Sequence, residues 1–384
     1  MRVIISAESF LPRSNGVTNS VFQVIANLKR AGHQPLVVAP GQGPSEVLGV
    51  QILRVPALSV SKFAQIDIAR VRVKALREII HNFAPDVAHL ASPFILGEQL
   101  RKAAADAKIP TVAIYQTDVT GFANFYGLSA VRAISEARIK KIHQAADLTL
   151  APSSSSISYL NSLGINRVKY WGRGVEHAQF CANHRSKQLR RGWGADDQSI
   201  VIGYVGRVAP EKQIEKLLAL SDLGRLSGRK IRLVVVGDGP SREKLQKQLP
   251  DAHFTGSLSG FELGQAMASL DILLSTGEHE TFCQVIQEGM AAGVAVVAAA
   301  AGGPLDLVQV GQSGELYAPG SISQMRRSLL RLITDDQLRR SYGAAGEKLV
   351  QGRSWQLICQ QLFDHYQAVI DDNLASRPIR SQSA

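Results

Sequence analysis

The sequence predicts an α/β protein built from two Rossmann-like domains. A chain of 384 residues is longer than one ordinary hydrophobic core covers, so we expect two domains. Short apolar runs with strand character alternate with amphipathic runs of helical period, as in parallel βαβ units. This pattern breaks down around residues 172–191 and then restarts, which places the domain boundary there.

The composition argues against a membrane-spanning or secreted protein. Hydrophobic residues make up 45% of the chain, yet no run approaches 18 apolar residues. The stretch Met1–Glu8 lacks the long apolar core of a signal peptide. Cys181, Cys283 and Cys359 form neither a metal-binding spacing nor a disulfide framework, which fits a reducing cytosol. We therefore expect a cytoplasmic protein.

Positive charge is concentrated in the first half of the chain. Residues 1–175 hold 20 Lys and Arg against 10 Asp and Glu, whereas residues 176–384 hold 23 against 22. This asymmetry indicates an anionic partner for the first half, either nucleic acid or an anionic membrane surface. A generally basic, solvated surface is the alternative. Nucleic acid is the weaker candidate because no aromatic-basic platform or known motif accompanies the charge.

Two predicted helices carry much of this charge. They span Ile66–Phe83 and Ser129–Ala145, and their apolar residues recur with a helical period. Basic amphipathic helices dock on anionic lipid, so these two favour a membrane surface as the partner. Their cations are Arg70, Arg72, Lys74, Arg77, Arg132, Arg138, Lys140 and Lys141.

The first βα connection contains a candidate phosphate contact. A strand over Arg2–Ala7 is followed by a turn-rich loop and a helix over about Asn19–Arg30. Asn15-Gly16 lies in this loop, and a glycine lets the backbone at a helix N-terminus approach an anion closely. An ordinary turn explains the same residues equally well.

Two other strand ends carry candidate site residues, because the carboxyl ends of parallel strands are where such folds bind ligands. Tyr115-Gln116-Thr117-Asp118 follows a predicted strand over Thr111–Ile114, which makes Asp118 a candidate. In the second half, Ser257 and Leu258 follow a short strand, and their backbone could face a nucleobase.

A pair of cations flanks the first loop of the second domain. The loop Gly206–Lys212 follows an apolar strand and opens a predicted helix over Lys212–Leu226. Two fixed cations beside a helix N-terminus, Arg207 and Lys212, suit a diphosphate, Arg by a bidentate fork and Lys as a point charge. An exposed ion pair in a loop is the alternative.

Two glutamates lie in the stretch Gly277–Met290. Glu280 and Glu288 are eight residues apart, at the mouth of a predicted helix and about two turns further on nearly the same face. Carboxylates are strong acceptors for hydroxyl groups, so this pair suits a polyhydroxylated ligand. Two solvated glutamates on a surface helix are the alternative.

In combination, these residues resemble the retaining, nucleotide-sugar-dependent glycosyltransferases of family 4, which have the GT-B fold. The likeness rests on Arg207-x4-Lys212 and Glu280-x7-Glu288 and covers about residues 1–360. It is closest to the actinobacterial GDP-mannose-dependent α-mannosyltransferases of glycolipid and lipoglycan synthesis. That closer likeness is carried by Glu8–Pro12, Asn15–Ser20, Tyr115–Asp118, Trp171–Val175 and His279–Gln284.

The resemblance implies a division into three parts. Residues 1–175 would form the acceptor-side domain and residues 176–355 the nucleotide-sugar domain, facing it across a deep cleft. Residues 356–384 would form a C-terminal helix that packs back on the first domain, with a frayed tail.

The resemblance also implies a role for each candidate site residue. Arg207 and Lys212 would clamp the diphosphate, and Glu280 would accept hydrogen bonds from hydroxyl groups of the donor sugar. Glu288 would hold the ribose hydroxyls, and Gly16 would admit the β-phosphate. The full donor-binding set would be Gly16, Arg207, Lys212, Ser257, Leu258, Glu280, Thr281, Phe282, Cys283 and Glu288.

One departure from the family concerns the acceptor side. Relatives often carry His where this chain has Gln116, and that His is often given an acceptor-side role. Asp118 is the replacement here. The catalytic group expected from the resemblance is therefore Arg207, Lys212, Glu280 and Asp118.

The implied activity is metal-independent, retaining transfer of mannose from GDP-mannose to a lipid-linked acceptor such as a phosphatidylinositol mannoside. No Asp-x-Asp occurs in the chain, and no cofactor or metal is expected. The basic first domain would hold the enzyme against the inner face of the plasma membrane. The alternatives are a UDP-sugar-dependent glycolipid transferase of sulfoquinovosyl or glucosyl type and a nucleotide-sugar-binding protein without transfer. A dehydrogenase is disfavoured because Gly16 stands alone where a Gly-x-Gly-x-x-Gly is needed.

Overall fold

The chain folds into two compact units, seen in a computed structural model that describes residues 1–12, 15–60, 66–117 and 129–376. Unit 1 comprises Met1–Arg173 together with Trp355–Ala384, and unit 2 comprises Gly174–Ser354. No helix in the described part of the chain is long and apolar enough to cross a bilayer.

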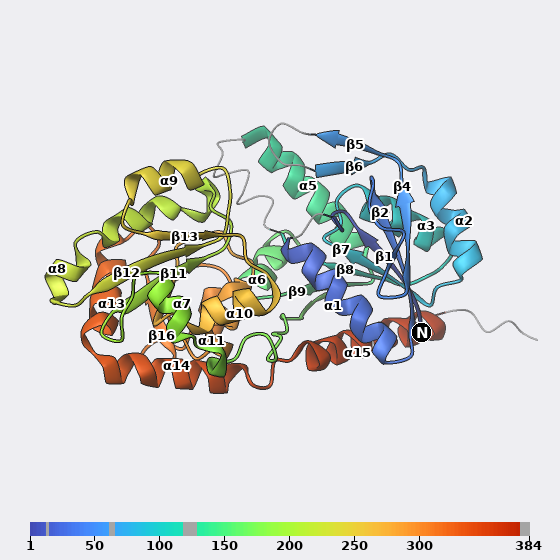
Figure 1. The fold of residues 1–384 in the computed structure, drawn as a ribbon. Helices are drawn as coiled ribbons and strands as arrows, with labels where there is room; N and C mark the ends of the chain where they lie inside the picture. Colours follow the sequence, from blue (N-terminus) through green and yellow to red (C-terminus); the bar gives the residue numbers. More distant parts are fainter. Residues whose placement is uncertain (13–14, 61–65, 118–128, 377–384) are drawn as a thin grey trace, which may run out of the picture. The chain divides into compact units, whose positions relative to one another are not determined.

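Unit 1 is built on a parallel sheet (Figure 1). Strand β1 lies in the interior of the sheet, with β2 to β4 on one side and β7 to β10 on the other. Among these strands, only β3 runs antiparallel to its neighbour. The order reverses between β1 and β7, which is the switch point of a doubly wound sheet. In sheet order the strands are β10 (Val168–Tyr170), β9 (Leu148–Ala151), β8 (Thr111–Ile114), β7 (Val87–Ala91), β1 (Arg2–Ala7), β2 (Gln34–Pro40), β4 (Val50–Val55) and β3 (Glu46–Val47).

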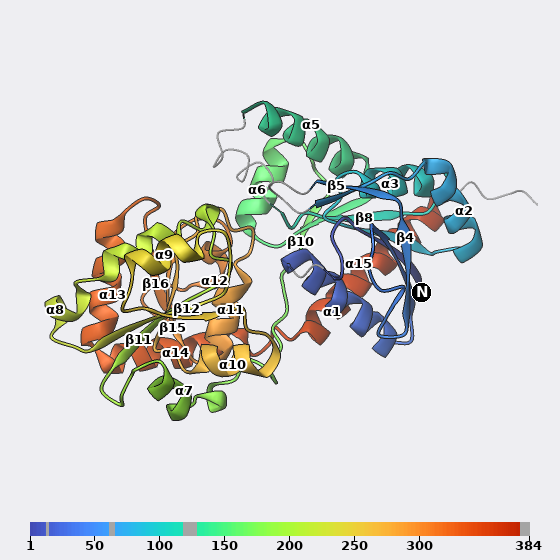
Figure 2. The same cartoon turned by 45° about the horizontal axis from the view of Figure 1, so that its top comes forward.

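Helices cover both faces of this sheet because its strands are apolar on both sides. Val3 and Ile5 join the core beneath α1 (Gly16–Arg30) and α15 (Trp355–Ala375), whereas Ile4 joins the core on the opposite face. Figure 2 shows α1 and α15 side by side, although they come from opposite ends of the chain. The opposite face is covered by α2 (Val73–Phe83) and α3 (Leu96–Asp106), and α5 (Ser129–Ala145) and α6 (Ser154–Ser162) complete the unit.

The helix expected over Ile66–Phe83 is wrong in its first part. Ile66–Ala69 is strand β6, which pairs antiparallel with β5 (Ala57–Val60), and the helix begins only at Val73. Apolar and polar side chains alternate over Ile66, Asp67 and Ile68, as in a strand. The helical pattern of the residues that follow led to the prediction of one longer helix.

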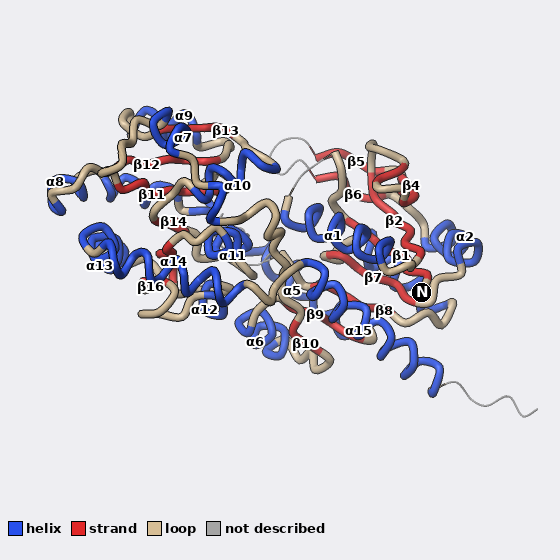
Figure 3. Tube along the Cα trace, turned by 60° about the horizontal axis from the view of Figure 1, so that its bottom comes forward, coloured by secondary structure: helices blue, strands red, loops and turns tan. Residues whose placement is uncertain are grey.

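Unit 2 contains a second parallel sheet with the strand order of a Rossmann fold. The order reverses between β11 and β14, so the connections after these two strands diverge to opposite faces of the sheet. Figure 3 shows its strands among the surrounding helices. In sheet order they are β13 (His253–Gly256), β12 (Ile231–Val236), β11 (Ile200–Val205), β14 (Ile272–Ser275), β15 (Ala295–Ala299) and β16 (Gly314–Tyr317).

Alternating apolar residues give this sheet two cores as well. Val201 faces the core that includes residues of α10 (Gly260–Ala268) and α11 (Gln284–Ala291), and Ile202 faces the core that includes α13 (Ile322–Thr334). The remaining helical segments are η1 (Ala182–His184), α7 (Lys187–Gly192), α8 (Leu223–Ser227), α9 (Arg242–Gln248), α12 (Pro304–Leu307) and α14 (Asp336–Val350).

The continuous helix expected over Lys212–Leu226 is also wrong. Two 3₁₀ segments, η2 (Pro210–Lys212) and η3 (Ile214–Leu220), precede the short helix α8. Gln213 separates the two segments with a left-handed φ of 51°, and the Thr276 hydroxyl donates a 2.6 Å hydrogen bond to the Lys212 carbonyl. The Lys212 carbonyl therefore accepts a hydrogen bond from the residue that follows β14.

Candidate active site

The candidate site of unit 2 lies at the switch point of its sheet. The loop after β11 carries Arg207 and Lys212, and the loop after β14 carries Glu280. These two strands are neighbours in the sheet, so their carboxyl ends bring the two loops together. Doubly wound folds bind their ligands at this position.

Lys212 and Glu280 form an ion pair across the switch point. The Lys212 Nζ lies 2.6 Å from Glu280 Oε1, and the two side chains are 33% and 17% exposed. Burial disfavours the Lys212 ammonium, but the adjacent Glu280 outweighs it and raises the pKa of Lys212 above its usual value. The lysine therefore stays charged in a partly desolvated position, as a phosphate ligand must.

Arg207 remains available for a ligand. Its guanidinium is 58% exposed and lies 3.3 Å from Glu211, an exposed pairing of the kind that contributes little to stability. The backbone around it is fixed, because the Tyr204 hydroxyl donates to the Arg207 carbonyl at 2.7 Å and Val208 N–H donates to the Asp238 carbonyl at 2.8 Å. The loop therefore presents a solvent-accessible cation from a rigid base.

Two glycines hold the loop that carries Glu280. A Cβ at Gly302 would overlap the Glu280 carbonyl, and a Cβ at Gly303 would overlap the Phe282 carbonyl. Gly303 N–H donates a 2.8 Å hydrogen bond to the Glu280 carbonyl. Gly237 and Gly239 pack in the same way against the backbone of Gly206 and Val208. Sequence reasoning gave these glycines no site role, because the contacts join segments far apart in the chain.

Glu280 and Glu288 do not share a helix, which corrects the expectation from their spacing. Helix α11 begins at Gln284, and Cys283 precedes it with a left-handed φ of 67°. Glu280 and Thr281 therefore lie in the loop, with Phe282 and Cys283 buried beneath it. Cys283 Sγ lies 3.4 Å from the Ser275 hydroxyl, and burial raises the pKa of its thiol to about 12.

Glu288 lies on the second turn of α11 in densely packed surroundings. Burial raises the pKa of its carboxyl to about 8, and a hydrogen bond from Gln284 offsets only part of that effect. Near neutral pH this carboxyl is largely protonated in the absence of a ligand. A carboxyl with so strongly shifted a pKa beside a ligand-binding edge is a candidate functional group.

The remaining expected site residues are dispersed. Ser257 and Leu258 follow β13, which is separated from β11 by β12. Gly16 is the first residue of α1 in unit 1, where Asn15 caps the helix by accepting from Thr18 N–H. Among the residues that the structure describes, a Cβ at Gly16 would meet no atom within 4 Å. Asp118 lies outside the described residues.

Gln116 is positioned by a cation that sequence reasoning did not connect with it. Arg173 donates a hydrogen bond to the Gln116 side-chain oxygen, and its guanidinium stacks 5.0 Å from the Trp171 ring centroid. Arg173 is buried, and burial lowers its pKa to about 10. Gln116 itself is half-buried, and it thus pairs with a buried cation at the carboxyl end of β8.

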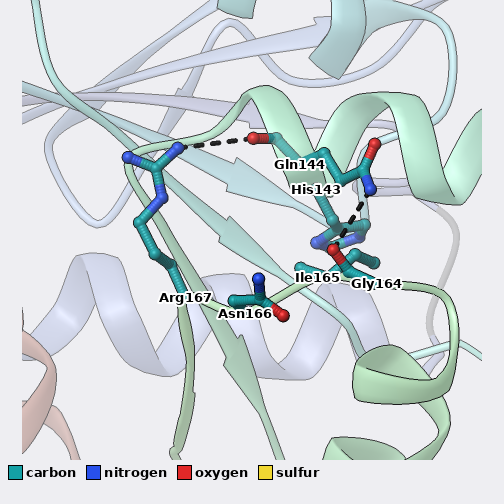
Figure 4. Close-up of a pocket in the computed structure, with 6 residues that line it drawn as sticks. All are labelled: His143, Gln144, Gly164, Ile165, Asn166 and Arg167. Atoms are coloured by element: carbon teal, nitrogen blue, oxygen red, sulfur yellow. Dashed lines mark hydrogen bonds between the residues drawn. The ribbon is translucent and has the colours of Figure 1, made fainter.

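A pocket of about 300 Å³ elsewhere in unit 1 is not part of this site (Figure 4). It lies between the end of α5 and the segment Gly164–Arg167, where Gln144 donates to the Gly164 carbonyl at 3.1 Å. These segments precede β9 and β10, so the pocket is at the amino ends of the strands. Ligands of doubly wound folds bind at the opposite edge.

The two Rossmann-like units give the chain the GT-B fold, which solved structures share. Sucrose-phosphate synthase from Thermosynechococcus elongatus shares the fold with a TM-score of 0.81 at 18% identity, over 97% of this chain and 99% of that one. An Anabaena protein solved with UDP and glucose has a TM-score of 0.75 at 20% identity, over 96% and 100%.

The chain belongs to the family 4 glycosyltransferases. The model of Glycosyltransferase Family 4 matches residues 14–179, and that of Glycosyl transferases group 1 matches residues 185–349. A GDP-mannose-dependent alpha-mannosyltransferase of Mycolicibacterium smegmatis is 44% identical over 96% of this chain and 98% of its own length. One of Corynebacterium glutamicum is 43% identical over 96% and 89%, and the sulfoquinovosyl transferase of Arabidopsis thaliana is 30% identical over 89% and 68%.

Proposed function

We propose that this glycosyltransferase moves mannose from GDP-mannose to a lipid-linked acceptor with retention of the anomeric configuration. The donor assignment is supported by relatives named GDP-mannose-dependent alpha-mannosyltransferase that are 42–44% identical over nearly the whole chain. The observation that carries the chemistry is the Lys212–Glu280 pair at the switch point, beside the exposed Arg207.

The cations of the site act on the leaving group. Negative charge grows on the diphosphate as the anomeric C–O bond breaks, and Arg207 and Lys212 stabilise that charge more in the transition state than in the ground state. Lys212 then exchanges its Glu280 partner for phosphate oxygen. Glu280 is left to accept hydrogen bonds from hydroxyl groups of the mannose, with backbone N–H groups around Phe282 and Cys283 as donors.

The carboxyl of Glu288 is proposed to accept the ribose hydroxyls, and the backbone of Ser257 and Leu258 to face the base. Gly16 is proposed to admit the β-phosphate at the N-terminus of α1, whose partial positive charge favours an anion. In retaining transfer by front-face attack, the leaving phosphate itself takes the proton of the acceptor hydroxyl. This route needs no enzymatic nucleophile, and the two cations supply the charge that a metal would otherwise provide.

The lipid acceptor is supported by the exposed side of α5. Lys140 and Lys141 are exposed there, together with the apolar side chain of Ile134, which is 66% exposed. Cations beside an apolar side chain suit the interface of an anionic bilayer. Two of the other expected cations are engaged within the protein, since Arg77 pairs with Asp106 at 2.5 Å and Arg138 donates to the Phe94 carbonyl at 2.8 Å. Lys141 Nζ lies 4.0 Å from Glu98 but is 67% exposed.

A donor screen tests the proposal. The purified protein would be incubated with radiolabelled GDP-mannose, UDP-glucose or UDP-sulfoquinovose and a membrane lipid extract, with and without EDTA. We expect labelled lipid from GDP-mannose alone, at an unchanged rate in EDTA. Labelling from a UDP-sugar would replace the donor assignment, and nucleotide-sugar binding without any labelled product would show a binding protein.

A further inference from the structure

A second ion pair lies behind the first one in the same two loops. Lys216 Nζ lies 2.5 Å from Glu278 Oε1, and the two side chains are 9% and 17% exposed. Lys216 follows Lys212 by four residues on η3, and Glu278 precedes Glu280 by two in the loop after β14. The two pairs therefore connect the same segments of chain at two successive points.

Additional contacts fix this inner pair in one arrangement. Lys216 Nζ also donates to the Thr276 carbonyl at 3.3 Å and lies 5.6 Å from the Tyr317 ring centroid. Gly320 N–H donates to Glu278 Oε1 at 2.7 Å. Burial opposes ionisation of Glu278, but the hydrogen bonds from Lys216 and Gly320 outweigh it and lower its pKa below the usual value. Both partners are thus held in a single geometry beside β16.

A buried ion pair is a poor source of net stability, because desolvation of the two charges offsets their attraction. Its best-attested use is to specify one register of packing over others. Here the segment whose packing register must be fixed is the loop that carries Glu280. This loop ends at Cys283, which has a left-handed φ. The 3₁₀ segment on the other side is unusually long for its type, since such runs seldom exceed four residues.

We propose that Lys216 and Glu278 are positioning residues, which hold the loop after β14 in register with η3 so that Glu280 meets Lys212 in the active site. The pair touches no substrate and acts only through the outer pair. The expected effect on turnover rests on the proposed function of Lys212 and Glu280, whereas the effect on their geometry does not.

The test uses Lys216→Met, Glu278→Gln and the double variant in the full chain. Each single variant leaves one buried charge without its partner, so we expect both the melting temperature and kcat to fall. In the double variant no unpaired charge remains, and the melting temperature should return toward that of the wild type. We expect kcat of the double variant for mannose transfer to stay at least about tenfold below that of the wild type, while its Kd for GDP changes by less than about threefold.

Arg190→Met is the matched control. Arg190 is a buried cation that pairs with Asp271 at 2.9 Å at the amino end of β14, the opposite end from Glu278. We expect it to lower the melting temperature while kcat stays within about twofold of the wild type. If kcat of the double variant instead returned to the wild-type value along with its melting temperature, the pair would serve stability alone and the proposal would be overturned.

A crystal structure of the double variant gives a readout that does not depend on turnover. We expect the separation of Lys212 Nζ and Glu280 Oε1 to exceed 4 Å in place of the present 2.6 Å. An unchanged outer pair would refute the positioning role even if the enzyme proved to use another donor. Failure of the wild-type protein to transfer mannose would count against the proposed function only.

Discussion

The pairing of Lys212 with Glu280 keeps the lysine charged in a partly buried position. A lysine in this partly buried position would lose its proton more readily if it stood alone, and Glu280 prevents this by raising its pKa. In the proposed function, a diphosphate replaces Glu280 as the partner of Lys212, and the carboxylate accepts hydrogen bonds from sugar hydroxyls. One contact of 2.6 Å therefore links the two halves of the proposed donor site.

Arg207 is expected to act mainly in the transition state. Arg207→Ala should lower kcat by about 10²–10³, because a fixed donor aimed at developing negative charge is worth that much in rate. Steady-state mannose transfer would measure the effect. Arg331→Ala is the matched control, since Arg331 is a 57% exposed cation of the same unit, which pairs with the buried Glu315 at 3.0 Å. Equal activity of the two variants would remove Arg207 from the site.

Glu288 should make nucleotide binding depend on pH. Its carboxyl has a folded-state pKa of about 8, and only the ionised form accepts through both oxygens from the ribose. Calorimetry should therefore show that GDP binds the wild type about 20-fold more tightly at pH 8.5 than at pH 6.5. This change is expected in addition to any change in affinity that Glu288→Gln shows over the same pH range. A Glu288→Gln variant with the same pH profile as the wild type would disprove this assignment.

The same shift sets the sign of a stability effect. Folding raises the pKa of Glu288 above the value of an unfolded chain, so the folded state favours the protonated carboxyl. The wild type should therefore lose stability relative to Glu288→Gln as pH rises from about 4.5 toward about 8, with little further change above that value. Thermal unfolding of both proteins from pH 6 to pH 9 measures the difference.

At the residue scale, the charged groups of the candidate site were predictable from the sequence, but the residues that hold them in place were not. Arg207 and Lys212 stand out by their spacing around a loop. The position of Glu280 in a loop, and not on the helix, was not predictable. The left-handed φ of Cys283 makes the helix begin only at Gln284, and no local sequence pattern indicates this turn. The contacts of Gly302 with Glu280 and of Lys216 with Glu278 join residues that are far apart in the sequence.

At the scale of elements, α5 is the part of the basic first half best suited to a membrane. Lys140→Glu/Lys141→Glu should weaken binding to vesicles containing anionic lipid by about 30-fold or more, since each cation near such a surface contributes about 1 kcal/mol. Sedimentation with anionic and with neutral vesicles would measure it. The control, Lys244→Glu/Lys247→Glu, makes the same charge change on exposed positions of α9 in unit 2. An equal loss in both would indicate a nonspecific effect of net charge.

Elements with a clear period were predictable, and those without one were not. Most sheet strands and α1 follow from short apolar runs and a helical apolar pattern, whereas β3 and β16 were not predicted. Strand β6 was included in the predicted helix because it has only four residues, and its partner β5 was not predicted. The 3₁₀ segments after β11 were read as a helix, because the hydrogen bond from Thr276 that engages the Lys212 carbonyl comes from another strand.

At the scale of the whole molecule, both units repeat one principle of construction. Each has a parallel sheet with a switch point at its first strand, and unit 2 places its charged groups there. The family 4 membership follows from matches to both halves of the chain. The charged residues proposed to bind the diphosphate and the sugar lie in two loops of unit 2, which join β11 to η3 and β14 to α11.

A crystal structure with GDP tests the central claim most directly. We expect Arg207 and Lys212 to lie within hydrogen-bonding distance of the diphosphate, Glu288 to contact the ribose hydroxyls, and Lys212 to have left Glu280. A nucleotide bound away from the carboxyl ends of β11 and β14, or bound there with the Lys212–Glu280 pair still at 2.6 Å, would contradict it.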